Sequence, residues 1–307
     1  MDNKIMAIQT GAAAESRFIS YLGIDGSKPQ SLTAYRTAIR RLFQFFQANG
    51  ITAPRRDDIA QYRAELLSKY KPATVSLYMT GARLFFQWTA QEGIYPNVAE
   101  HIKGAKQIHG FKKDYLTPDQ ARAVIATTQG SSRAELRDRA ILLLMVTTGL
   151  RCIEVSRANI EDLRHTAGYT ALDIQGKGHD GKDEYVKVAP AVENAINAYL
   201  ATRQDRKSDA PLFTSESNSS QGSRLTTRSI SRLVKNHMRT AGLDSDRLTA
   251  HSLRHTAATL NLLNGGTERE TQQMLRHKNI NTTMIYSHAL DRAANASEQR
   301  IAAALGI

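Results

Sequence analysis

The sequence has little cysteine and no long apolar run. A single cysteine, Cys152, cannot form a disulfide within the chain, which agrees with a reducing compartment. The longest continuous apolar run, residues 140–146, is far too short to cross a bilayer. The opening residues, MDNKIMAIQTG, do not show the basic-then-apolar pattern of a signal peptide. We therefore expect a cytoplasmic protein that does not act at a membrane.

Signatures of nucleotide-driven and metal chemistry are also missing. No G-x-x-x-x-G-K-[ST] phosphate loop occurs, and no dense cluster of Asp and Glu suggests a two-metal nuclease. His251 and His255 have the spacing of a zinc pair, but the Glu of H-E-x-x-H is absent and a permanent cation, Arg254, lies between them. The sequence therefore predicts neither a metal nor a cofactor.

Acidic residues are too few to balance the basic ones. The chain has 41 Lys and Arg against 29 Asp and Glu, a net charge of +12, and such a field attracts a polyanion and speeds its capture. Residues 1–104 contain 13 basic and 8 acidic residues, net +5, which leaves 28 and 21, net +7, for the rest. Both parts are basic, as expected if both contact one nucleic acid; a merely basic, soluble protein is the alternative.

What the sequence does contain is helical periodicity in two blocks. At 307 residues the chain exceeds the usual size of one core, so two domains are expected. Apolar residues recur at helical spacing over 31–50, 57–68 and 72–93, but the pattern is lost in HIKGAKQIHGFKKDYLTPDQ. Thr117, followed by Pro and Asp, then marks a new helix start. We predict a helical domain over 1–104, a basic linker over 105–114 and a second domain over 115–307.

The second domain should be mainly helical with a small β-sheet or hairpin. An apolar stretch from Leu136 to Thr148 predicts a buried helix that Gly149 closes, so that Arg151 lies just beyond a buried helix end. The runs TALDIQ and EYVKVAP, separated by GKGHDGKD, predict a hairpin that carries Lys177. Residues after Pro190 are predicted to be helical apart from a polar loop at 214–224.

Several polar side chains of this domain form a set suited to phosphodiester chemistry. Arg151 and Arg254 can clamp the non-bridging oxygens of a phosphate while staying charged at any relevant pH. Tyr286 can attack phosphorus and conserve the bond energy as a phosphotyrosyl ester. A lysine can protonate the leaving 5′ oxygen, and histidines can bind the phosphate or take the phenolic proton. Each residue alone is equally compatible with a structural role.

The order of four motifs carries a specific resemblance. TTGLRCIEVSRANIEDL, then GKG, then HSLRHTAATL, then LRHKNINTTMIYSH resembles the tyrosine recombinases, the phage-integrase family, and in size most resembles the compact Xer-type and integrative-element members. Residues 1–104 resemble, more weakly, the helical core-binding domain of that family. The resemblance assigns catalytic positions to Arg151, Lys177, His251, Arg254, His277 and Tyr286, with Glu154 as a supporting acid.

The resemblance also implies a role for each residue. Tyr286 would be the nucleophile, Lys177 the acid for the leaving 5′ hydroxyl, and Arg151 and Arg254 the phosphate clamp. His255 is expected to be structural.

Two features depart from the family pattern. Arg276 stands where the family usually has glycine before its later histidine, and Lys182 is a second hairpin lysine that competes with Lys177 for the acid role.

As a family member, the protein would enclose duplex DNA in a C-shaped, two-domain clamp and form a 3′-phosphotyrosyl link. It would work as a tetramer on paired recombination sites, with accessory proteins in some systems and a C-terminal helix over 291–307 that packs on itself or on a neighbour. The task would be integration or excision of a mobile element or resolution of chromosome dimers. A DNA-binding regulator on the same scaffold and a type IB topoisomerase are the alternatives.

Basic residues outside the catalytic motifs are candidate phosphate contacts, with a solvated surface as the equally simple explanation. They lie off the apolar stripe of the 31–50 helix and along the linker: Arg36, Arg40, Arg41, Lys103, Lys106, Lys112 and Lys113.

Overall fold

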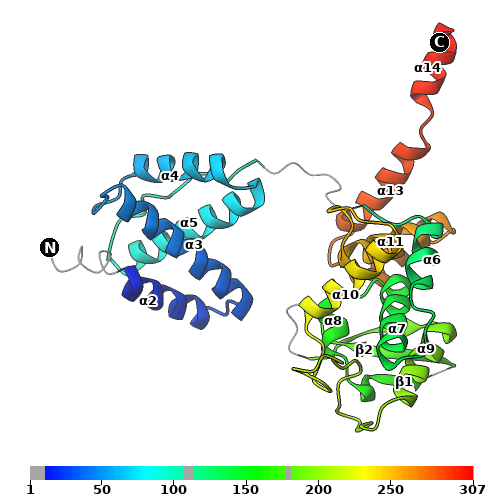
Figure 1. Ribbon diagram of the computed structural model, residues 1–307. Coiled ribbons are helices and arrows are strands. Elements are labelled where there is room, and N and C mark those ends of the chain that lie inside the picture. Colours follow the sequence, from blue (N-terminus) through cyan, green and yellow to red (C-terminus); the bar gives the residue numbers. More distant parts are fainter. Residues whose placement is uncertain (1–10, 107–113, 167, 177–180, 307) are drawn as a thin grey trace. The chain divides into compact units, whose positions relative to one another are not determined.

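The computed structural model describes residues 11–106, 114–166, 168–176 and 181–306 (Figure 1). The chain divides into two compact units, residues 1–109 and 110–307, and each has its own hydrophobic core. Helices predominate in both, and the second unit also contains a three-stranded antiparallel sheet. The predicted mainly α fold with a small sheet is therefore confirmed. Within the described ranges no helix has the length and apolar character needed to cross a bilayer.

The first unit is a small helical domain. Its helices are α2 (Gly11–Ile24), α3 (Pro29–Ala48), α4 (Arg56–Lys69) and α5 (Pro72–Gln91). Proline occupies the first turn of α3 and α5, where its missing N–H costs no hydrogen bond, and Asp57 and Asp58 favour the positive end of the α4 dipole. Helix α2 is not among the helices predicted from the sequence.

Aromatic side chains form much of the first core. Phe18 of α2 meets Phe85 of α5 edge to face, with ring centroids 5.5 Å apart, and Trp88 lies 5.7 Å from Phe85. Helices α3 and α5 pack closely at Gly81, where an added Cβ would lie 2.6 Å from the Ala38 Cβ. The aromatic stripe of α5 is thus part of the core.

The second unit carries the remaining elements. They are α6 (Pro118–Ala126), α7 (Arg133–Thr148), α8 (Cys152–Arg157), a 3-10 turn η1 (Ile160–Asp162), β1 (Leu163–Thr166), β2 (Tyr169–Ile174), β3 (Glu184–Val188), α9 (Pro190–Ala201), α10 (Thr227–Thr240), α11 (Ala250–Leu263), α12 (Glu268–Leu275), α13 (Asn281–Ala294) and α14 (Ser297–Leu305).

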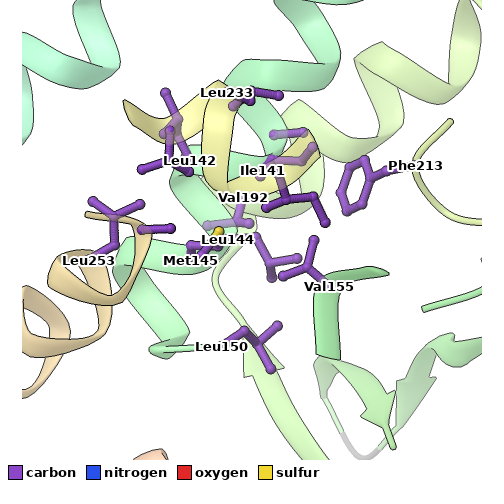
Figure 2. Close-up of a cluster of buried hydrophobic side chains, with 14 of the residues drawn as sticks. Ile141, Leu142, Leu144, Met145, Leu150, Val155, Val192, Phe213, Leu233 and Leu253 are labelled. Carbon is purple, nitrogen blue, oxygen red and sulfur yellow. The ribbon is translucent and has the colours of Figure 1, made fainter. Parts of the chain in front are cut away.

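Helix α7 is the central element of the second core. It packs against α9 and α11, and Figure 2 shows its apolar side chains gathered with Val192, Phe213 and Leu253. Ile141 and Leu144 of α7 are fully buried. The helix ends where Gly149 adopts a left-handed conformation, φ 64°, as the sequence predicted. Burial on several sides fixes the point at which the chain leaves the core toward Arg151.

The sheet has the order β1-β2-β3. The hairpin predicted from TALDIQ and EYVKVAP is β2 and β3, which pair Leu172 with Val186 and Asp173 with Tyr185. Strand β1, LRHT, is short and largely polar, and it is not among the predicted strands. Lys177 lies outside the described residues.

Candidate active site

Arg151 and Glu154 form one unit at the start of α8. The Arg151 backbone N–H donates to Glu154 Oε2 at 2.7 Å, and its Nη1 donates to Oε1 at 2.8 Å. The Glu154 side chain is fully buried, whereas that of Arg151 is 31% exposed. Burial alone would raise the pKa of Glu154, but the charges of Arg276 and Arg151 and the bonds from Arg151 outweigh it and hold that pKa below its usual range. Arg151 is therefore fixed by a charged carboxylate while part of its guanidinium faces solvent.

Arg254 projects from α11 between the chain segments that contain Gly149 and Leu275. It is 2% exposed, and its Nη1 donates to the Gly149 carbonyl at 2.6 Å while its Nη2 donates to the Leu275 carbonyl. Burial, followed by repulsion from Arg151 and Arg276, lowers the pKa of Arg254 to about 9, so the side chain stays charged at neutral pH. Two predicted clamp residues from distant parts of the chain are thus brought near each other.

Tyr286 lies on α13 among three histidines. Its side chain is buried, and its Oη lies 2.8 Å from His255 Nδ1. The His277 ring is nearly parallel to the phenol at a centroid distance of 6.5 Å, and His251 meets His255 edge to face at 4.6 Å. His277 Nδ1 is in turn 2.8 Å from Thr283 Oγ1, which orients the ring. The structure therefore gathers the predicted nucleophile with both predicted histidines.

His255 lies closer to the proposed chemistry than the sequence indicated, because its Nδ1 contacts the Tyr286 hydroxyl. The contact fits a structural role as well as a chemical one, so the sequence-based expectation that His255 is structural stays a prediction. The available signal was its place four residues after His251, which puts both rings on one face of α11. Its position next to Arg254 in the sequence pointed to the same region.

The rings of His251, His255 and His277 are neutral at neutral pH. Burial lowers the pKa of His255 and of His277 to about 4, helped by neighbouring cations, and it also lowers the pKa of His251. Burial raises the pKa of Tyr286, although the charges of Arg254 and Arg151 act in the opposite direction. A neutral phenol thus faces a neutral imidazole within hydrogen-bond distance.

The hairpin is tied to the site near its base. Arg157 Nη1 donates to the Gly176 carbonyl at 3.2 Å, and Lys182 Nζ lies 2.6 Å from Oδ1 of the buried Asp162. Lys182, the alternative to Lys177, is thus engaged in an ion pair. Because residue 177 lies outside the described residues, the assignment of Lys177 stays a prediction.

Arg276 and the surface arginines have partners of their own. Arg276 Nη2 donates to Glu154 Oε2 at 3.0 Å. Arg36 and Arg40 of α3 both reach Glu15, at 3.4 and 3.0 Å, with side chains 48% and 64% exposed. Lys103 and Lys106 are exposed, and residues 112 and 113 are not described. A role for this surface in DNA binding stays a prediction.

The chain is similar to known proteins over most of its length. Residues 114–292 match the model of the phage integrase family, and residues 16–93 match its N-terminal SAM-like domain. Tyrosine recombinase XerC of Pelobacter propionicus is 31% identical over 271 residues, 86% of both chains. Tyrosine recombinase XerA of Pyrococcus furiosus is 28% identical over 284 residues, 92% of both chains.

Solved structures show the same fold. The XerH recombinase in its post-cleavage complex with the difH substrate superposes with a TM-score of 0.68 at 21% identity, covering 90% of this chain and 79% of that one. A lambda integrase dimer on a COC′ core site gives a TM-score of 0.69 at 18% identity, covering 88% and 96%. The match of residues 114–292 to the family model and the 31% identity to XerC of Pelobacter propionicus show that the chain belongs to the phage integrase family.

Proposed function

We propose that this chain is a site-specific tyrosine recombinase that cleaves and rejoins DNA through a 3′-phosphotyrosyl intermediate. The observation that carries the proposal is the Tyr286 hydroxyl, which lies 2.8 Å from a neutral His255 and within the field of Arg254 and Arg151. Family membership adds the reaction class, because the relatives matched over most of the chain are tyrosine recombinases.

In the chemical step the phosphoryl group moves from the 5′ oxygen of DNA to the tyrosine, and no water molecule takes part in the exchange. Tyr286 Oη attacks the scissile phosphorus, the bond from phosphorus to the 5′ oxygen breaks, and the 3′ phosphate remains esterified to the tyrosine. His255 takes the phenolic proton, and the 5′ oxygen receives a proton from Lys177, a role that rests on the sequence resemblance. A 5′ hydroxyl from a partner strand then attacks the phosphotyrosyl ester and reverses the step.

Two guanidiniums stabilise the charge that builds on the non-bridging oxygens. Arg151 is oriented by Glu154 and Arg254 by two backbone carbonyls. His251 and His277 are assigned to hydrogen bonds with the same phosphate. Preorganised donors of this kind favour the transition state over the ground state.

The proposed partner is duplex DNA with paired recombination sites. XerH is described on a palindromic difH substrate, and lambda integrase as a tetramer on a Holliday junction. By analogy we assign this chain a two-domain clamp on DNA and a tetrameric assembly. The exposed Ile301 and Leu305 of α14, 60% and 69% exposed, support a C-terminal helix that packs on a neighbouring subunit.

A suicide substrate tests the proposal. Duplexes from DNA that flanks the gene are first screened for binding, and the bound site is then nicked so that the fragment leaving after attack diffuses away. The intact protein should form a covalent adduct that Tyr286→Phe abolishes, because phenylalanine has no nucleophilic oxygen. Strand exchange between two such sites separates a recombinase from a type IB topoisomerase, and absence of any adduct with the intact protein would falsify the enzymatic role.

A further inference from the structure

Arg276 has an unusual backbone. It caps α12 with φ 56° and ψ 46°, the left-handed region that favours glycine and that bulky residues enter rarely. Among the described residues, His101 is the other non-glycine with a positive φ. A conformation of this kind costs free energy and is retained where the surrounding structure requires the side chain.

The side chain of Arg276 compensates for the buried charge of Glu154. It is 6% exposed, and its Nη2 donates to Glu154 Oε2, the oxygen that also accepts the Arg151 backbone N–H. One carboxylate therefore bridges two arginines, and its other oxygen holds the Arg151 guanidinium. Without Arg276 the buried carboxylate would keep Arg151 as a partner but lose part of the positive charge that compensates it.

Arg276 also links the elements on which the proposed catalytic residues lie. Its Nε is 3.8 Å from Oε2 of Glu184, the first residue of β3 and thus of the strand that follows the hairpin tip. In the backbone it stands between Leu275, whose carbonyl accepts from Arg254, and His277, whose ring lies parallel to Tyr286. One residue therefore connects α8, β3 and the loop between α12 and α13.

We propose that Arg276 is a positioning residue of the recombinase site, which acts through Glu154 to hold the Arg151 guanidinium in its phosphate-binding orientation. This inference rests on the proposed functions of Arg151 and Tyr286. A simple helix cap would need only the backbone conformation, which glycine supplies at lower cost.

Substitution by glycine separates the two roles. Arg276→Gly keeps the left-handed cap and removes the guanidinium, so adduct formation on the nicked duplex should slow about 10- to 100-fold, the range expected for a misplaced catalytic group. DNA affinity should stay within about twofold, because one buried side chain is a small part of the backbone contacts. The acid side of the pH–rate profile should move toward higher pH, because the loss of the Arg276 cation raises the pKa of Glu154.

Two further variants complete the test. Arg276→Lys keeps the charge without the planar fork and should recover part of the rate, and it carries the test if the glycine variant does not fold. His101→Gly is the matched control, because His101 also has a positive φ but its side chain is 84% exposed. This variant should cleave DNA at the wild-type rate. Wild-type rate and an unmoved pH profile in Arg276→Gly, or in Arg276→Lys if only that variant folds, would overturn the proposal. Lack of adduct with the unaltered protein would instead count against the proposed function.

Discussion

The imidazole rings around Tyr286 couple the site to the stability of the fold. His255 and His277 have folded-state pKa values of about 4 against an ordinary value of 6.5. Above pH 6.5 both rings are neutral in the folded and unfolded chains and contribute no pH dependence. Below it the unfolded chain binds protons that the folded chain refuses until about pH 4, so the free energy of unfolding falls as pH falls through this window.

We therefore expect a lower melting temperature at about pH 5 than at about pH 7.5. Each ring is only partly buried, so solvent screening reduces the loss in the free energy of unfolding to about 1 kcal/mol. This loss corresponds to a fall in melting temperature of about 2 to 4 °C. Thermal melts followed by circular dichroism across this range provide the measurement. The double variant His255→Asn, His277→Asn should show a shallower slope, and an equal slope would assign the pH dependence to other groups.

At the same scale, the proposed catalytic residues and the supporting acid Glu154 could be predicted from the sequence, but several contacts that position them could not. Arg151, Arg254 and Tyr286 lie in ordered motifs, and the structure brings them together with His251 and His277. The contact of His255 with Tyr286 depends on how α11 meets α13, which no local pattern specifies. Arg276 was visible as a departure from the family pattern, but its bond to Glu154 spans 122 positions and needs the folded chain.

Among the elements, the junction between α7 and α8 places the tightest constraint on the site. Gly149 has φ 64°, and a Cβ added there would lie 2.4 Å from Leu275 Cδ2 and 3.6 Å from Arg254 Cγ. Its carbonyl also accepts from Arg254. The turn that ends the central helix therefore also shapes the pocket of the second arginine.

Gly149→Ala should accordingly be costlier than an ordinary substitution at a left-handed glycine. We expect the free energy of unfolding to fall by about 2 to 4 kcal/mol, because the backbone is strained and the added Cβ overpacks against Leu275. Cleavage should also slow, because Arg254 shifts. Gly242→Ala is the matched control, since φ is 77° there but nothing lies within 4 Å of the added Cβ. Chemical denaturation of both variants gives the comparison, and equal losses would show that strain alone determines the cost.

Periodicity predicted several elements that bury one apolar face, but it missed helix α2 and strand β1. Helices α3 and α5 and the hairpin of β2 and β3 agree with their patterns. Strand β1 has the burial of an edge strand, with Arg164 and His165 exposed, so its alternation is weak. It is a strand because β2 supplies its hydrogen-bonding partners, and that information lies in another part of the chain.

At the scale of the whole molecule, charge is divided evenly between two units that have separate cores. Residues 1–109 contain 14 basic and 8 acidic residues, and residues 110–307 contain 27 and 21, so each carries +6. Part of this charge serves the fold, because Arg56, Arg63 and Arg83 donate to backbone carbonyls within residues 100–104. Exposed basic side chains such as those of Arg36 and Arg40 remain accessible to a polyanion.

If both units contact DNA, binding by the full chain must release more counterions than binding by the second unit alone. Each neutralised phosphate contributes about 0.9 to the slope of log K against log salt concentration, so the full chain should show a slope steeper by several such increments than residues 110–307. Fluorescence anisotropy on one duplex at four or five salt concentrations measures both slopes. The variant Arg36→Gln, Arg40→Gln of the full chain should lower its slope by about 2 if both exposed arginines exchange Glu15 for phosphates. Equal slopes for the full chain and for the second unit would mean that the first unit makes few phosphate contacts, and its positive charge would then have to be explained by solubility alone.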